Sequence, residues 1–133
     1  LTDMKFPLVS FANIETSRWL AERFNLTEDP EFGLNPQRFK NNIWLKGLKP
    51  WQELEWLNGQ QILTIGGAQI KMFMPVGRCN NINANPTTGQ QDSLLQPLTQ
   101  VAHDLGHYDL GYAEPKPLMG VFGIVVKGGE IGL

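Results

Sequence analysis

Two β-prone runs separated by a pair of glycines constrain the fold of this chain more than any other feature. Residues 61–65 and 68–74 are rich in long and branched apolar side chains, and only Gly66-Gly67 stands between them. Glycine adopts the positive φ angles of a two-residue β-turn without steric cost. The sequence therefore predicts an antiparallel hairpin, whose second strand leads into a loop that holds the only cysteine of the chain.

Other short runs predict the remaining strands. Residues 5–11 alternate loosely between apolar and polar side chains, residues 41–45 form a short apolar run, and residues 121–126 are strongly β-prone. Strands outnumber helices and follow one another through short turns, which favours a curled sheet over a doubly wound parallel one. We therefore predict a mainly β (α+β) fold of about five strands, a small barrel or curled sheet with two or three peripheral short helices.

Helical spacing identifies the peripheral elements. Residues 14–24 place apolar and small side chains on one face and charged ones on the other, and Asn13 can cap this helix. Pro50 suits the first turn of a short helix. Pro97 likewise suits the start of an amphipathic helix that Gly106 ends.

Length and charge narrow the class of protein. A chain of 133 residues suits one domain and can bury its own core. The net charge of −2 and the pI near 5.6 argue against a nucleic-acid partner, which needs clustered Lys and Arg.

No apolar run approaches the roughly 20 residues that cross a bilayer, so we expect no membrane partner. A single cysteine cannot form an internal disulfide, and the default compartment is therefore cytoplasmic.

The segment from Pro75 to Gly89 carries the most chemistry. Cys79 follows an apolar run and comes directly after the basic residue Arg78, a context that favours a reactive cysteine. Residues 85–89 carry turn chemistry, so we expect the thiol where a buried strand emerges into an ordered loop. The alternative is a small buried hydrophobe, which is what most free cysteines are.

Five short motifs occur along the chain in a characteristic order. They are Arg38-Phe39-x-x-Asn42-Ile43, Pro75-x-x-Arg78-Cys79, Asn85-Pro86-x-Thr88-Gly89 with Asp92, Gly120-Val121-Phe122, and Gly128-Gly129-x-Ile131. In order and spacing they resemble the MOSC domain, the C-terminal domain of molybdenum-cofactor sulfurases. By this resemblance, residues 1–133 form a single MOSC-like domain that lacks the first strands and the extreme C-terminus of the family.

The resemblance implies a barrel-like β fold that binds molybdenum cofactor (molybdopterin) or carries sulfur as a cysteine persulfide. In relatives that reduce N-hydroxylated compounds a cysteine ligates molybdenum, and that role falls here on Cys79, as both catalytic residue and metal ligand. Soft thiolate is a suitable donor for such a metal. Pyridoxal phosphate is not expected in this chain, because no lysine has the context of a Schiff base.

Polar side chains of the motifs and the cysteine loop are candidates to hold the cofactor. The candidate cofactor-binding residues are Arg38, Asn42, Arg78, Asn81 and Asn83. A guanidinium fork suits phosphate or pterin, and an amide suits the polar edges of pterin. Salt bridges that fix a loop and turn hydrogen bonds are the alternative roles of these side chains.

Two further sets of residues are weaker candidates. His103 and His107 are four apart, but Gly106 ends the predicted helix between them and no third ligand has a recognisable spacing, so zinc is not expected. Trp51 and Trp56 are suited to stacking on a pterin, but core or lid packing is the commoner role of such a pair.

The first hypothesis for function is a molybdenum-dependent oxidoreductase that reduces small N- or S-oxygenated compounds. It needs an external electron-transfer protein, because the sequence has no flavin or nicotinamide fingerprint. The alternative is a non-catalytic sulfur carrier, in which Cys79 accepts a persulfide from a cysteine desulfurase for metal–sulfur cluster assembly. A third possibility is a binding or scaffold domain with an inert cysteine.

Overall fold

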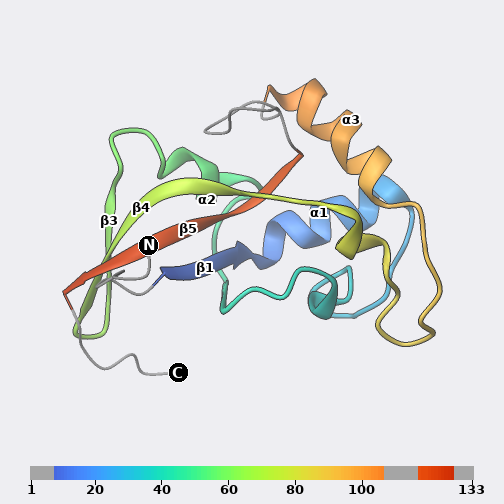
Figure 1. Cartoon of the computed structure of the whole chain (residues 1–133), viewed down its shortest axis with the longest axis horizontal. Coiled ribbons are helices and arrows are strands. Elements are labelled where there is room, and N and C mark those ends of the chain that lie inside the picture. Colours follow the sequence, from blue (N-terminus) through green and yellow to red (C-terminus); the bar gives the residue numbers. More distant parts are fainter. Residues whose placement is uncertain (1–7, 107–116, 128–133) are drawn as a thin grey trace.

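The computed structural model describes residues 8–106 and 117–127 of the chain (Figure 1). Its elements are β1 (Leu8–Asn13), α1 (Ile14–Phe24), the 3₁₀ helix η1 (Pro36–Arg38), β2 (Ile43–Leu45), α2 (Gln52–Glu55), β3 (Ile62–Ile65), β4 (Ala68–Gly77), the 3₁₀ helix η2 (Asn80–Asn83), α3 (Leu95–Leu105) and β5 (Leu118–Lys127). The predicted mainly β fold with a few short helices is confirmed. The first residues of the strand predicted at 5–11, and His107, lie outside the described residues.

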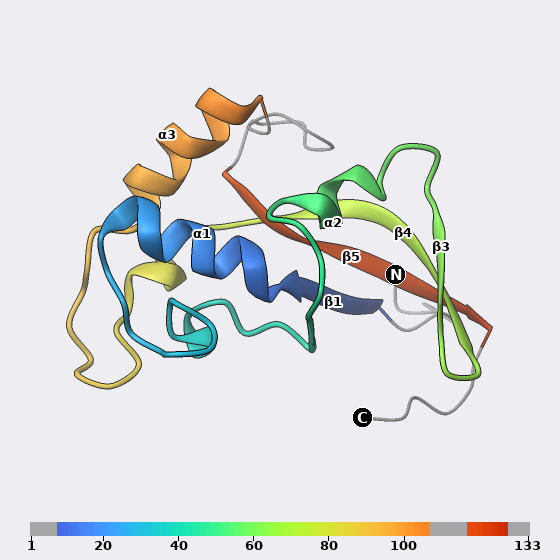
Figure 2. The same ribbon diagram turned by 180° about the vertical axis from the view of Figure 1, so that it is seen from behind.

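Five strands form one curled sheet in the order β2-β1-β5-β4-β3. The predicted hairpin is present, with β3 antiparallel to β4 and Ile65 opposite Ala68. The strand β1 pairs antiparallel with β5 and parallel with β2. Both views place α1 and α3 at one end of the sheet and the β3–β4 hairpin at the other (Figure 2). The long strand β4 therefore runs from the hairpin towards the helical end, where it is followed by Cys79.

The predicted helix caps are confirmed, but two helix starts are wrong. The Asn13 side chain accepts from the amide of Glu15 at 2.9 Å, and Gly106 is the C-cap of α3. The helix α2 begins at Gln52 instead of at Pro50, because Trp51 has a left-handed φ of 66° and its amide donates to Thr16 Oγ1 at 2.7 Å. A helix cannot continue through that conformation.

The second wrong start is that of α3, which begins at Leu95, two residues before Pro97. The amides of Leu94 and Leu95 donate to Asn83 Oδ1 at 2.9 and 2.8 Å. A distant side chain thus satisfies amides that the start of a helix leaves without intrahelical partners. Pro97 still lies within the first turn, where its missing N–H costs nothing.

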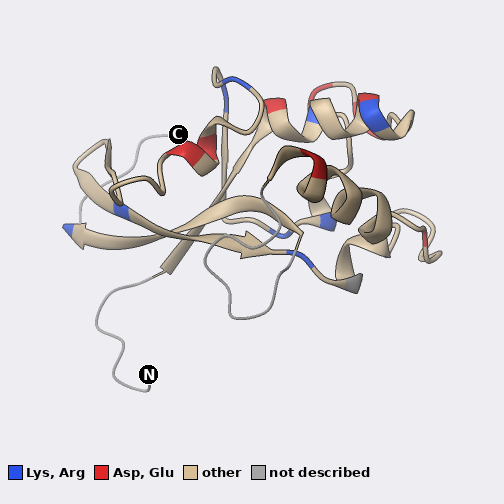
Figure 3. Cartoon of the chain, turned by 90° about the horizontal axis from the view of Figure 1, so that it is seen from above, with Lys and Arg blue, Asp and Glu red and all other residues tan. Residues whose placement is uncertain are grey.

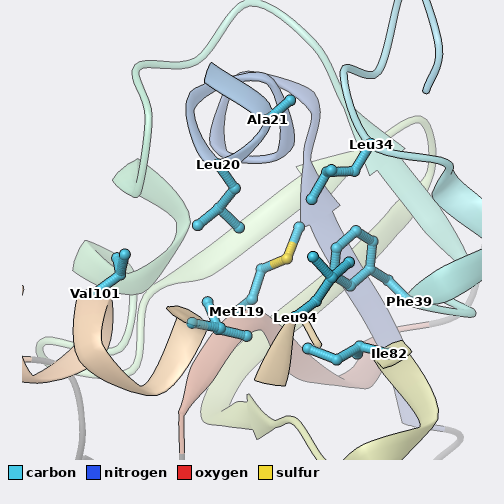
Figure 4. Close-up of a cluster of buried hydrophobic side chains, with 9 residues drawn as sticks. Leu20, Ala21, Leu34, Phe39, Ile82, Leu94, Val101 and Met119 are labelled. Carbon is cyan, nitrogen blue, oxygen red and sulfur yellow. The ribbon is translucent and has the colours of Figure 1, made fainter. Parts of the chain in front are cut away.

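Two hydrophobic clusters hold the elements together. One joins α1, α3 and the start of β5, and its close-up in Figure 4 shows Leu20, Val101 and Met119 side by side with Phe39 and Ile82. The other lies between the sheet and α2 and includes Phe11, Leu54, Ile70, Met72 and Val121. Trp51 packs against both clusters and Trp56 against the second, so packing accounts for this pair of tryptophans.

Charged residues are spread over helices, strands and loops, with acidic and basic residues interspersed along the chain (Figure 3). Within residues 8–106 and 117–127, no helix combines the length and the apolar character that a membrane crossing requires.

Candidate functional site

Cys79 lies where the sequence places it, directly after the strand β4 and before η2. Its side chain is exposed, so it is not the small buried hydrophobe of the alternative interpretation. The loop that follows is anchored, because Ile82 is 3% exposed and packs in the first hydrophobic cluster. The sulfur is thus presented on an ordered backbone instead of a free loop.

The thiol faces a small hollow that adjoins a larger groove. The hollow has a volume of about 170 Å³, and Cys79, Lys40 and Asn81 are among the residues that line it. The groove has a volume of about 620 Å³. It is lined by Pro36, Gln37, Lys40, Asn41, Trp44, Asn81, Ala84 and Pro86. Lys40 and Asn81 line both spaces, so the hollow beside Cys79 adjoins the groove at these two residues.

Two segments, residues 36–44 and 77–86, form the walls of this site, and Arg38 connects them from the protein interior. Its side chain is fully buried, and its guanidinium donates to Glu28 Oε1 and Oε2 at 2.7 and 2.5 Å and to Asp92 Oδ2 at 2.6 Å. It also donates to the carbonyls of Ile82 and Ala84 at 2.9 and 3.2 Å. These acceptors all belong to the protein, so the predicted role in cofactor binding has no support from this geometry.

The ion pairs around Arg38 change the acidity of all three groups. Hydrogen bonds from the guanidinium lower the pKa of the Glu28 carboxyl and that of the Asp92 carboxyl below their ordinary values. The same bond to Glu28 raises the pKa of Arg38. Hence the cluster is charged at neutral pH and ties η1 to the segment that follows Cys79.

Arg78, next to Cys79, connects the same two walls in the opposite direction, because it binds residues of the 36–44 segment. Its Nε and Nη2 donate to the carbonyl of Met119 at 2.9 and 2.6 Å, and its Nη1 donates to the carbonyl of Phe39 at 2.8 Å. Its Nη2 also donates to Asn41 Oδ1 at 2.9 Å, and the guanidinium lies 5.2 Å from the centre of the Phe39 ring. The structure thus gives Arg78, like Arg38, a set of protein acceptors.

The room for Arg78 depends on a glycine of β5. Gly120 has a φ of 90°, and a Cβ at this position would lie 2.7 Å from the Phe11 carbonyl oxygen and 3.2 Å from Arg78 Nη2. Both the conformation and the space therefore require glycine. This is the physical reason for the first residue of the Gly120-Val121-Phe122 motif.

The three candidate asparagines occupy different positions. Asn42 Oδ1 accepts from the amide and hydroxyl of Ser10 at 2.9 and 3.1 Å, which joins the residue before β2 to β1. Asn83 caps α3, as described above. Asn42 and Asn81 are both exposed, but of the three only Asn81 lines the hollow and the groove.

Some residues of the site were not predicted from the sequence. Lys40, Gln37 and Trp44 line the groove, yet none was a candidate. Lys40 lies between the motif residues Arg38 and Asn42, and this position was the one sequence feature that could have identified Lys40 as a candidate. Nothing in the sequence shows that Arg38 is buried and that Asn42 binds Ser10, while Lys40 lines the hollow.

Metal-binding histidines are not part of the site. His103 is exposed on α3, and the part of the chain that the structure describes contains no group of three His, Cys, Asp or Glu arranged to hold a metal ion. A metal at this site would therefore depend on the sulfur of Cys79 together with ligands that the cofactor itself brings.

The residues present fit a molybdenum cofactor by their chemistry. The site offers one exposed thiol as a soft donor, the amides of Gln37 and Asn81 for the polar edges of a pterin, and Lys40 as a cation for an anionic group. The indole of Trp44 adds a planar apolar surface. This donor set is found in and beside the hollow that Cys79 lines.

Comparison with known proteins points to the same family. The model of the MOSC domain matches residues 7–133, which is nearly the whole chain. A search of curated proteins found no match. The motifs, the curled β-sheet and this match agree, and the chain therefore belongs to the MOSC domain family.

Proposed function

We propose that this protein binds molybdenum cofactor with Cys79 as the metal ligand and reduces small N- or S-oxygenated compounds. The observation that carries the proposal is the exposed thiol in a hollow that adjoins a groove of about 620 Å³. The family match supports the cofactor, since the MOSC domain is associated with it. The groove has room for a pterin, and the hollow leaves space for a small substrate beside the sulfur.

Different side chains of the site bind different parts of the cofactor in this proposal. Cys79 holds the metal through its thiolate, Asn81 orients the pterin through its amide, and Trp44 packs against its ring. The two arginines hold the walls in place from behind. When bound, the cofactor supplies a redox-active metal that exchanges two electrons with the substrate.

The proposed reaction breaks the N–O or S–O bond of the substrate. Two electrons and two protons are consumed, the oxygen leaves as water, and the nitrogen or sulfur is recovered in its reduced form. The electrons come from an external electron-transfer protein, which is the partner we propose. A thiol that must stay reduced to bind metal suits the cytoplasm, where disulfides are rare, and we propose that compartment.

Metal analysis tests the proposal. The full chain, produced in cells that synthesise the cofactor, is expected to contain molybdenum in a near-equal molar amount, and Cys79→Ala is expected to lose it because the soft donor is gone. The control is Thr87→Ala, which alters an exposed side chain of the same loop and leaves the thiol intact. Equal molybdenum in Cys79→Ala and in the unmodified chain would contradict the ligand assignment.

The second candidate function is the sulfur carrier, which the exposure of Cys79 also favours. In that reaction the Cys79 thiolate attacks the outer sulfur of a desulfurase persulfide. The S–S bond of the donor breaks, the donor thiolate leaves, and Cys79 becomes a persulfide without net oxidation. Intact-mass analysis after incubation with a cysteine desulfurase and free cysteine is expected to show one added sulfur atom, absent in Cys79→Ala. No added mass would count against the carrier.

A further inference from the structure

The walls of the hollow and groove carry positive charge without negative charge. Among the described residues that line them, three are cations, namely Arg38, Lys40 and Arg78, and none is Asp or Glu. A concave site lined by one sign of charge concentrates ligands of the opposite sign. The geometry therefore favours an anionic group in this region of the surface.

The three cations differ in what they offer to a ligand. The charge of Arg38 is offset by Glu28 and Asp92, which pair with it inside the protein. The guanidinium of Arg78 is directed at the carbonyls of Phe39 and Met119. The Lys40 residue is exposed, and its ammonium has no acidic partner among the described residues. Lys40 is thus the cation that can meet a ligand directly.

The backbone of Lys40 is held in an unusual conformation. Its φ is 49°, in the left-handed region that residues with a Cβ rarely adopt. Arg78 binds the residues on both sides of it, the carbonyl of Phe39 at 2.8 Å and Asn41 Oδ1 at 2.9 Å. A strained residue persists where its surroundings impose it, and such residues gather at binding sites. Arg78 is therefore a positioning residue that acts through Lys40.

We propose that the hollow beside Cys79 is a subsite for the anionic group of the molecule that reacts there, a carboxylate, sulfonate or phosphate, with Lys40 as its cation. The subsite rests on charge and geometry alone, and its use in catalysis rests on the proposed function. It predicts that the substrates are small oxygenated compounds that also carry a negative charge. Lys40 lines both spaces, so the subsite lies at the junction of hollow and groove.

Alkylation of the single cysteine tests the subsite without any cofactor. Iodoacetate is anionic and iodoacetamide is neutral, and both react with the same thiolate, so the ratio of their rates cancels the ionisation of Cys79. In the metal-free full chain, Lys40→Asn is expected to lower the iodoacetate-to-iodoacetamide ratio roughly three- to tenfold, because a nearby positive charge is lost. Asparagine tolerates the left-handed φ of this position.

The control for charge is Lys46→Asn, which removes an exposed cation that lines neither space. Its ratio is expected to equal that of the unmodified chain, and added salt is expected to reduce the ratio of the unmodified chain. An unchanged ratio in Lys40→Asn, or an equal fall in Lys46→Asn, would overturn the subsite.

The positioning role is tested through Asn41, because a variant of the buried Arg78 risks unfolding. Asn41→Ala removes one bond of Arg78 and leaves both cations in the chain. We expect the ratio to fall about twofold or more while the iodoacetamide rate is unchanged. A ratio equal to that of the unmodified chain would show that Arg78 does not act through Asn41 on Lys40.

Cofactor-loaded protein identifies the source of the anionic group. Inorganic phosphate is expected to raise the KM for substrate without changing kcat, because both compete for Lys40. Absence of inhibition, combined with loss of molybdenum in Lys40→Asn, would assign the subsite to the phosphate of the cofactor and overturn the substrate assignment. A chain that binds no molybdenum but shows the Lys40-dependent ratio keeps the subsite and rejects the proposed function.

Discussion

Arg38 and Arg78 show that a guanidinium can suit either of two roles, binding a ligand or binding acceptors of the protein itself. The planar fork of a guanidinium fits phosphate, carboxylate and backbone carbonyls equally well, so the sequence around Arg38 and Arg78 was consistent with cofactor binding. In the structure both forks bind carbonyls on the opposite wall of the site, and Arg38 also binds two carboxylates. Lys40 is therefore the cation that the surface of the site presents to a ligand.

Loss of Arg38 is expected to be strongly destabilising. Arg38→Gln leaves the carboxylates of Glu28 and Asp92 without their cation and the carbonyls of Ile82 and Ala84 without a donor. Removing one partner of a buried ion pair typically costs about 3–5 kcal/mol. Denaturant unfolding measures this cost as the fall in the free energy of unfolding.

The control is Arg18→Gln, which breaks a surface pair with Glu15 at 3.5 Å. Exposed pairs of this kind contribute about 0–1 kcal/mol. Comparable losses in Arg18→Gln and Arg38→Gln would show that Arg38 does not tie the walls of the site together.

At the scale of the elements, local chemistry was sufficient wherever the partners are close in sequence. The hairpin, the Asn13 cap of α1 and the Gly106 cap of α3 each depend on neighbouring residues, and all three predictions are confirmed. The starts of α2 and α3 depend on Thr16 and Asn83, which lie in other segments. Such long-range bonds leave no periodic signal in the sequence, so these boundaries were wrong.

The cap of α3 by Asn83 leads to a prediction at this scale. Asn83→Ala removes the acceptor of the Leu94 and Leu95 amides, so the first turn of α3 is expected to fray. Loss of a capping side chain typically costs about 1 kcal/mol. Hydrogen exchange at these two amides measures the effect, with faster exchange expected. The matched control is Asn81→Ala in the same 3₁₀ helix, and similar exchange in the two variants would refute the role of Asn83.

At the scale of the whole molecule, the site exists only because two distant segments are brought together. Residues 36–44 and 77–86 line the hollow and the groove, and neither segment forms the site alone. The motifs predicted that both segments matter and that Cys79 belongs to the site. Which side chains face the ligand depends on the paths of β4 and η1 and on the two arginines, and these follow from tertiary packing.

The pH dependence of stability also involves residues far apart in the fold, because the pKa is raised for one carboxyl and lowered for two others. Burial raises the pKa of Glu53, which accepts from Asn13 Nδ2 and Thr16 Oγ1 at 3.1 and 2.9 Å. Its stabilising contribution is present in full below the ordinary value of 4.5 and is lost as pH rises through the raised pKa. Glu28 and Asp92 have lowered pKa values, so their contribution is lost as pH falls below 4.5 and 3.8 respectively.

The free energy of unfolding is therefore expected to peak at mildly acidic pH, above 4.5 and below the raised pKa of Glu53. Denaturant unfolding across this range measures the profile. Glu53→Gln keeps an oxygen that can accept from Asn13 and Thr16 but removes the ionisation, so the decline on the alkaline side is expected to disappear. Glu55→Gln, an exposed change on the same helix, is expected to keep that decline. An alkaline decline that persists in Glu53→Gln would mean that some other group titrates there and that Glu53 folds as a carboxylate of ordinary acidity.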